Sequence, residues 1–217
     1  NYKIMDNKNF EVYFDCGFSK IRVCAFNKHN PKNIFCTVSE FFFDHSNIDF
    51  EIQSIISSLE KDTKEYLDNI NLMIDSPKMI SVAISISKKL EGSKLKKEDV
   101  KFLVQEAKQQ AIKSYPDKQA VHIIIQNYKI DDTHYTFLPD DINCNLISLD
   151  ILFICLPKKT IEYFKKLFFK LNISVNKFFC STYVKSINYK DNFLSAKEVS
   201  FVDIGFKKTS IACYSEN

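Results

Sequence analysis

Two stretches near opposite ends of this 217-residue chain carry the same pattern, an apolar strand that ends in Asp-x-Gly and a tight turn. The chain has only three glycines, where average usage would give about fifteen. Two of the three stand in these stretches. Aligned without gaps, the stretches share four identities and one aromatic position: Asp15 with Asp203, Gly17 with Gly205, Phe18 with Phe206, Lys20 with Lys208, and Phe26 with Tyr214. The repeat predicts two β-hairpins of one type.

Between the hairpins the apolar pattern switches between the strand period of 2 and the helical period of 3.6. It predicts strands at 12–14, 21–25, 34–43, 72–74, 80–86, 120–125, 146–156 and 173–179, and helices at about 49–67, 98–113 and after Pro157. This order predicts a mixed α/β fold. The block from about Ile80 to Phe178 is predicted to be a self-contained insert.

The overall composition indicates an ordinary globular chain. Hydrophobic residues make up 45% and charged residues 26%, and the net charge of +3 comes from interspersed Lys, Glu and Asp. This charge pattern gives no case for a nucleic-acid partner. The apolar run Ile151–Leu156 is too short to cross a bilayer, and the polar start predicts no signal peptide. We therefore expect a chain that is soluble by itself.

The cysteines and histidines show no metal-binding or catalytic pattern. The seven cysteines are odd in number and none stands at C-x2-C spacing: Cys16, Cys24, Cys36, Cys144, Cys155, Cys180 and Cys213. We expect them to be reduced, as in the cytoplasm. The four histidines are scattered, and His122 is predicted to be an ordinary sheet residue. No metal site and no catalytic residue is predicted.

The two Asp-x-Gly turns have the residue types of a phosphate clamp. Glycine lets the backbone approach an anion, and turn N–H groups can point at phosphate oxygens. Asp15 and Asp203 would hold Mg²⁺ through water, and Ser19 and Lys20 would add a hydroxyl donor and a cation. The candidate cofactor-binding residues are Asp15, Gly17, Phe18, Ser19, Lys20, Asp203, Gly205, Lys207 and Lys208. Two ordinary β-hairpins remain the alternative.

Several segments together resemble FtsA, the bacterial actin-like protein that ties the tubulin-like FtsZ ring to the membrane. Asp15–Lys20 resembles the first phosphate motif, D-I-G-T-S-K, and Val202–Gly205 resembles the second, V-D-I-G-G-G-T. Ile125–Asp131 is similar to the segment P-Q-x-Y-x-I-D, which is the one most specific to FtsA. Pro139 begins the stretch that in the family reads P-V-G-x-S-G.

The resemblance implies an actin-like (ribonuclease H-like) α/β fold. Residues 1–79 and 179–217 would form subdomain 1A and the start of a second lobe that is mostly absent. Residues 80–178 would form the inserted α+β subdomain called SHS2 or 1C. It also implies a cell division scaffold at the inner, cytoplasmic face of the membrane. The insert would serve self-association and contacts with other division proteins, and FtsZ would bind through the missing second lobe.

Departures from the family pattern predict a chain that is not an enzyme. Glycines of the second phosphate loop and of the P-V-G stretch are replaced by Phe206, Lys207, Asp141 and Cys144. We therefore expect no cofactor on this chain, with ATP and Mg²⁺ possible in a full-length protein. Asp15 and Asp203 should still share one cleft edge. A PilM-like pilus-assembly adaptor is the alternative function. A sugar or acetate kinase of the same fold is disfavoured because neither a substrate-binding acid nor a second lobe is visible.

Overall fold

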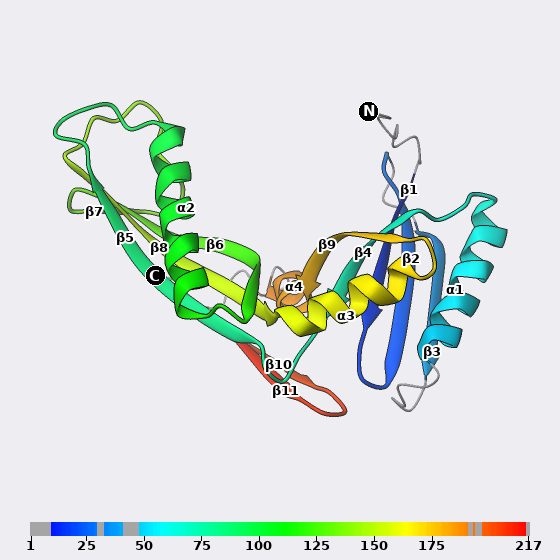
Figure 1. Ribbon diagram of the computed structural model, residues 1–217. Coiled ribbons are helices and arrows are strands. Elements are labelled where there is room, and N and C mark those ends of the chain that lie inside the picture. Colours follow the sequence, from blue (N-terminus) through cyan, green and yellow to red (C-terminus); the bar gives the residue numbers. More distant parts are fainter. Residues whose placement is uncertain (1–9, 30–32, 41–47, 191–192, 194–196, 216–217) are drawn as a thin grey trace. The chain divides into compact units, whose positions relative to one another are not determined.

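The computed structural model describes residues 10–29, 33–40, 48–190, 193 and 197–215. It divides into two compact units, one made of Asn1–Pro77 with Thr160–Asn217 and the other of Lys78–Lys159. Figure 1 gives the labels of the helices and strands. The mixed α/β class predicted from the sequence is confirmed by the sheets and helices of both units.

The first unit is built on a five-stranded sheet with strand order β3-β2-β1-β4-β9. Its strands are β1 (Phe10–Cys16), β2 (Lys20–Asn27), β3 (Asn33–Glu40), β4 (Asn69–Ile74) and β9 (Ser174–Cys180). The strands β1, β2 and β3 are antiparallel neighbours, whereas β4 and β9 run parallel to β1. The predicted strand at 34–43 ends in a segment, 41–43, that lies outside the described residues.

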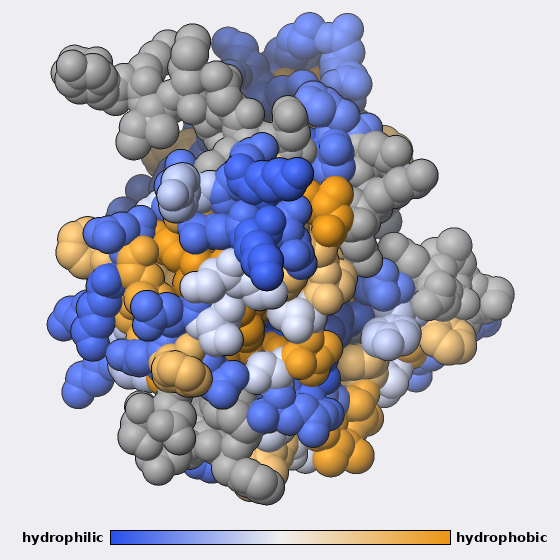
Figure 2. Space-filling model, turned by 90° about the vertical axis from the view of Figure 1, so that its right-hand side faces the viewer, coloured by the Kyte–Doolittle hydropathy of each residue, from blue (hydrophilic) through white to orange (hydrophobic). Residues whose placement is uncertain are grey.

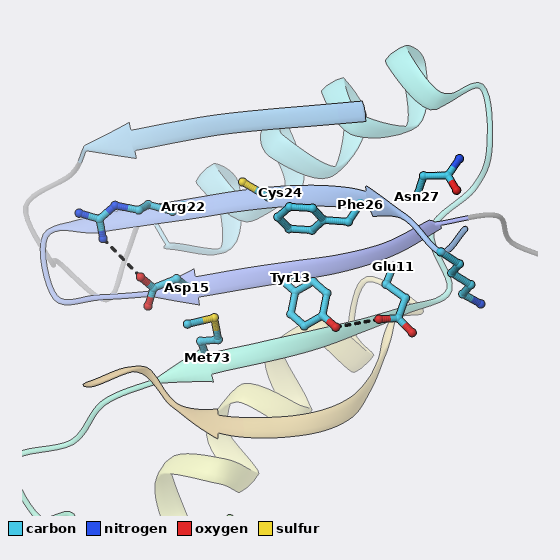
Figure 3. Close-up of a pocket in the computed structure, with 9 residues that line it drawn as sticks. Glu11, Tyr13, Asp15, Arg22, Cys24, Phe26, Asn27 and Met73 are labelled. Atoms are coloured by element: carbon cyan, nitrogen blue, oxygen red, sulfur yellow. Dashed lines mark hydrogen bonds and ion pairs between the residues drawn. The ribbon is translucent and has the colours of Figure 1, made fainter. Parts of the chain in front are cut away.

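Helices α1 (Ile48–Thr63) and α3 (Lys158–Phe169) cover one face of this sheet. Every second residue of β1 and β2 is buried on that face, as the strand period of 2 requires. Phe14 of β1 meets Phe168 of α3 edge to face, with ring centroids 5.3 Å apart, and both side chains are fully buried. The other face of β1, β2 and β4 carries side chains that line a hollow (Figure 3).

A two-stranded ribbon completes the first unit. It consists of β10 (Glu198–Ile204) and β11 (Thr209–Ser215), which pair with each other only among the described strands. Helix α4 (Ser181–Lys190), which the sequence pattern did not predict, packs against this ribbon and against β9 (Figure 1). Tyr189 stacks on Phe201 with centroids 5.4 Å apart, and the hydroxyls of Ser186 and Tyr214 are hydrogen-bonded at 2.6 Å.

The second unit is a four-stranded antiparallel sheet with order β5-β8-β6-β7 and one helix on one face. The elements are β5 (Ile80–Lys89), α2 (Lys97–Ser114), β6 (Lys118–Ile130), β7 (Thr133–Tyr135) and β8 (Leu146–Pro157). Leu103 and Ala107 of α2 are buried in one core with Ile147 and Phe153 of β8. β6 continues past the predicted end at residue 125. The sequence pattern missed this extension because register shifts near His122 and Asn127 break the simple alternation of a strand.

The insert predicted at 80–178 differs from this unit at its C-terminal end. The compact unit ends at Lys159, and most of α3 and all of β9 belong to the first unit. The physical reason is strand pairing, because β9 hydrogen-bonds in parallel to β4, with Ile70 opposite Val175 and Leu72 opposite Phe178. A boundary at 178 would detach this edge strand from its sheet.

Figure 2 shows one face of the molecule, coloured by hydropathy. On this face, hydrophilic and hydrophobic side chains alternate in small groups.

Cys24 and Cys36 lie opposite each other on β2 and β3 and are joined by a disulfide. This pair corrects the expectation that the cysteines are all reduced, since the antiparallel register places the two residues side by side.

Candidate functional site

The carboxyl ends of three parallel strands meet at one edge of the five-stranded sheet. Asp15 lies near the end of β1, Asp75 follows β4, and Ser181 follows β9 at the start of α4. Ligand sites of α/β sheets are found at this edge, because strand ends and helix starts converge there. The sheet topology therefore places two carboxylates and a hydroxyl together.

The two repeated hairpins close with the same turn. The backbone N–H of Gly17 donates to the carbonyl oxygen of Lys20 at 2.9 Å, and that of Gly205 donates to Lys208 at 2.8 Å. A Cβ atom on Gly17 would lie 3.2 Å from its Lys20 oxygen, and one on Gly205 would lie 3.0 Å from the Lys208 oxygen. A side chain at either glycine would thus crowd its own turn, which accounts for both glycines, and the anion-approach role stays a prediction.

A cavity of about 200 Å³ lies between the two turns, within the first unit. It is lined by Asp15, Cys16, Gly17, Phe18, Ser19, Lys20, Arg22, Asp75, Ser181, Lys185, Asp203, Ile204, Gly205, Phe206, Lys208 and Ser210. The prediction that Asp15 and Asp203 share one cleft edge is confirmed. The structure brings together all the predicted phosphate-turn residues except Lys207, which is not among those lining the cavity. Whether they bind a cofactor stays a prediction.

Asp15 is buried and held by three side chains. The Ser181 hydroxyl donates to its Oδ1 at 2.6 Å. Its Oδ2 lies 3.3 Å from the Arg22 guanidinium and 3.2 Å from the Lys185 ammonium. Hydrogen bonds to charged groups are among the stronger ones in proteins, so Asp15 is fixed in one orientation.

The other two carboxylates are also paired with lysines. Lys185 Nζ lies 3.7 Å from Asp203 Oδ2, so one ammonium stands between Asp15 and Asp203. Asp75 accepts a hydrogen bond from the Thr182 hydroxyl at 2.6 Å and pairs with Lys208 at 3.4 Å. The Lys208 ammonium is buried and has no hydrogen-bond partner among the described residues, so the ion pair with Asp75 is what balances its charge.

The remaining cations of the turns are engaged at the surface. Lys20 Nζ lies 2.5 Å from Glu40 Oε1 at the adjacent end of β3. The hydrogen bond from Lys20 holds the pKa of the Glu40 carboxyl below its ordinary value. Lys207 lies over the ring of Phe18 at 5.8 Å, which is a cation–π distance and joins the second turn to the first.

The buried thiols at this edge stay protonated at neutral pH. Burial, reinforced by the nearby Asp75 carboxylate, raises the pKa of Cys180 to about 12. Burial also raises the pKa of Cys16, with the adjacent Asp15 charge adding to the effect. A thiolate is the nucleophilic form of cysteine, so neither residue is set up for covalent chemistry.

Sequence reasoning missed Asp75, Thr182 and Lys185. Asp75 could have been found, because it follows an apolar strand in the same way as Asp15 does. The two α4 residues carried no such signal, because the helix itself was not predicted. Within the parts of the chain that are described, no group of three or more His, Cys, Asp or Glu side chains is arranged to hold a metal ion.

A larger hollow of about 710 Å³ lies on the face of the sheet opposite α1 and α3 (Figure 3). Its floor includes the side chains of Tyr13, Phe26 and Met73, and charged residues stand around them. The Tyr13 hydroxyl donates to Glu11 at 2.7 Å, and burial together with this carboxylate raises the pKa of Tyr13 to about 12. This hollow is apolar in the middle and polar at its ends.

The segment most similar to FtsA, Ile125–Asp131, stabilises a turn and the core of the second unit. Asp131 adopts a positive φ of 49° after β6, and its carboxylate accepts hydrogen bonds from the backbone of Asn145 and Leu146 at 3.0 and 2.9 Å. Ile130 is buried and Tyr128 packs against the same core. These residues are therefore accounted for by the turn and the core that they stabilise.

Comparison with known proteins shows the fold. No family model matches the chain, and no curated protein does. Among solved structures, a chain of the "PilM-PilN type IV pilus biogenesis complex" aligns with a TM-score of 0.62 at 9% identity. The alignment covers 94% of this chain and 58% of that one, so this chain spans less than two thirds of its neighbour.

A second solved structure is described as a Bacteroides thetaiotaomicron VPI-5482 protein with actin-like ATPase fold and unknown function. It aligns with a TM-score of 0.45 at 11% identity, covering 99% of this chain and 69% of that one, and we draw no argument from it. The match to the pilus complex shows that this chain shares the fold of that chain, in keeping with the mixed sheet topology. The finer assignment to FtsA rests on the sequence motifs alone.

Proposed function

We propose that this chain belongs to a non-catalytic adaptor with the actin-like fold, which binds protein partners and does not turn over ATP. The observation that carries the proposal is the internal pairing of charges at the two turns. Each carboxylate at the cavity that would face Mg²⁺ or phosphate is already paired with a lysine of the same chain: Asp15 and Asp203 with Lys185, and Asp75 with Lys208.

The size of the cavity supports the same conclusion. Pockets for cofactors and drug-sized ligands usually measure about 300–1,000 Å³, whereas this one measures about 200 Å³. Phe18 and Phe206 occupy the positions after each turn glycine and are among the residues that line the cavity. We therefore propose that the turns are vestigial phosphate turns and that this chain holds no cofactor. In this proposal, ATP and Mg²⁺ could bind only in a full-length protein.

The first candidate role is an FtsA-like division scaffold, which the motif resemblance supports. In this version the unit around residues 80–178 is an SHS2 (1C) subdomain that mediates self-association and contacts with other division proteins. FtsZ binds through a second lobe outside this chain, and the assembly acts at the cytoplasmic face of the cell membrane. Among the described helices, none is both long and apolar enough to cross a membrane.

The second candidate role is a PilM-like pilus-assembly adaptor. The specific observation in its favour is the fold match over 94% of the chain to a structure of PilM with its partner PilN. The motif that favours FtsA is accounted for in the second unit by Asp131 and its backbone hydrogen bonds, which lowers its weight as a functional signature. Both candidates are adaptors, and they differ in the partner.

Two measurements test the proposal. Calorimetry of the purified chain with Mg-ATP is expected to show no binding, and a micromolar Kd would overturn the proposal that this chain holds no cofactor. Capture experiments with immobilised chain then compare FtsZ with PilN from the same cell. We expect no tight capture of FtsZ by residues 1–217. Saturable binding of PilN selects the pilus role, whereas strong FtsZ capture contradicts the assignment of FtsZ binding to another lobe.

A further inference from the structure

The actin-like fold implies a divalent cation near the two turn carboxylates, Asp15 and Asp203. The question is whether the side chains around these carboxylates leave room for such an ion. Mg²⁺ takes near-octahedral oxygen ligands and keeps several of its own waters. In this chain the space between Asp15 and Asp203 already holds the ammonium of Lys185, at 3.2 Å from one carboxylate and 3.7 Å from the other. A divalent ion placed there would meet a fixed positive charge at contact distance. The residues present do not fit the metal.

We propose that the Lys185 ammonium is a built-in replacement for the divalent cation of this fold. It pairs with both turn carboxylates in the absence of ligand and links the second hairpin to the first. The proposal deepens the non-catalytic function above, because a site that supplies its own cation has no need of nucleotide-bound metal to keep its two turns together.

The position of Lys185 on α4 supports this role. Ser181 and Lys185 are four residues apart on one helix, so their side chains share a face. Both reach the same carboxylate, the hydroxyl at Asp15 Oδ1 and the ammonium at Oδ2. The Lys185 side chain is 31% exposed and that of Asp15 is 11% exposed, so the pair is partly shielded from bulk water. Charges attract each other more strongly there than they would in water.

Removing this ammonium should uncover a metal site. With Lys185 uncharged, Asp15 keeps Arg22 as a partner, but Asp203 loses the cation that faces it. The two carboxylates then repel each other across the vacated space. A divalent cation is the species that relieves this repulsion and accepts their oxygens.

The test uses Mn²⁺ alone, without nucleotide, and measures bound ion by electron paramagnetic resonance. We compare the wild-type chain with Lys185→Met and with Lys185→Gln, whose amide can still hydrogen-bond the carboxylates if the Met variant fails to fold. The matched control is Lys190→Met on the same helix, whose ammonium lies over the Tyr214 ring. Mn²⁺ binding is expected to be about tenfold or more tighter in the Lys185 variants than in wild type and control.

Adding Asp203→Asn to a Lys185 variant should abolish the gain. The proposal is overturned if wild-type chain binds Mn²⁺ as tightly as the variants, if folded Lys185 variants gain nothing, or if the gain survives Asp203→Asn. Because no nucleotide is present, this outcome is separate from the Mg-ATP measurement. A wild-type chain that binds Mg-ATP but not Mn²⁺ alone would contradict the proposed function and leave the lysine assignment standing.

Discussion

The two Asp-x-Gly hairpins have the same turn, but their surroundings differ. The first hairpin, β1–β2, lies inside a five-stranded sheet, whereas the second, β10–β11, is a two-stranded ribbon. Aligned residues show the contrast: Phe14 is fully buried and its counterpart Val202 is 50% exposed, and Val23 is fully buried while Ile211 is 65% exposed. A two-stranded ribbon is marginal in water by itself. The repeat thus encodes the turn, and the neighbours decide how firmly each hairpin is held.

The largest expected effect comes from truncating the matched residues of the two hairpins. Phe14→Ala removes a buried ring that packs on Phe168 and should lower the free energy of unfolding by about 3–5 kcal/mol. Val202→Ala, at the aligned position, should change it by less than about 0.5 kcal/mol because half of that side chain is in water. Urea denaturation followed by far-UV circular dichroism measures both. Equal losses would show that the second hairpin is as deeply packed as the first.

A smaller effect is expected from cutting the ion pairs that join the hairpins. Lys185→Met leaves the fold of β1–β2 in its sheet but removes the cation that faces Asp203. Amide hydrogen exchange should then become roughly fivefold faster in β10–β11, which corresponds to about 1 kcal/mol for a partly exposed pair. Exchange in β1–β2 should stay unchanged, so the first hairpin is the internal control. Uniform acceleration in both hairpins would contradict the picture of a local tie.

Much of the candidate site could be predicted from the sequence because the repeat is local. The spacing of Asp15, Gly17 and Lys20 determines a turn that recurs at Asp203, and the fold brings both copies to one cavity. Lys185 could not be predicted, because Ser181–Lys190 mixes polar and apolar residues without a clear helical face. Nor could the sequence show that Val202 is exposed, since it precedes Asp-x-Gly just as Phe14 does. Burial depends on strands that are far away in the chain.

The predicted insert, 80–178, differs from the compact unit Lys78–Lys159 for a related reason. The pattern of residues 173–179 predicts a strand, and β9 is there, but a strand pattern does not say which sheet it joins. Pairing of β9 with β4 is a contact across about a hundred residues, so it is settled by tertiary packing. The same holds for Cys24 and Cys36, whose pairing depends on the register between β2 and β3.

The smallest effect concerns the aligned lysines, Lys20 and Lys208. Lys208 pairs with the shielded Asp75, whereas Lys20 pairs with the exposed Glu40. The hydrogen bond from Lys20 lowers the pKa of Glu40 in the folded chain, so the ionised carboxylate favours folding. This stabilisation is fully present above the ordinary glutamate pKa of about 4.3 and is lost as the pH falls through the lowered folded value.

Glu40→Gln should therefore be slightly less stable than wild type at pH 7, and the gap should close as the pH is lowered toward 3. Urea denaturation across this range measures the gap, with Glu198→Gln as a control at an exposed carboxylate of the second hairpin. Water screens an exposed pair, so the gap at pH 7 should be small. A gap that widens on acidification would mean that Glu40 is not stabilised as its anion. Lys20 of the first hairpin would then not be held by Glu40. The contrast between this exposed pair and the shielded pair of Lys208 and Asp75 would then have no support.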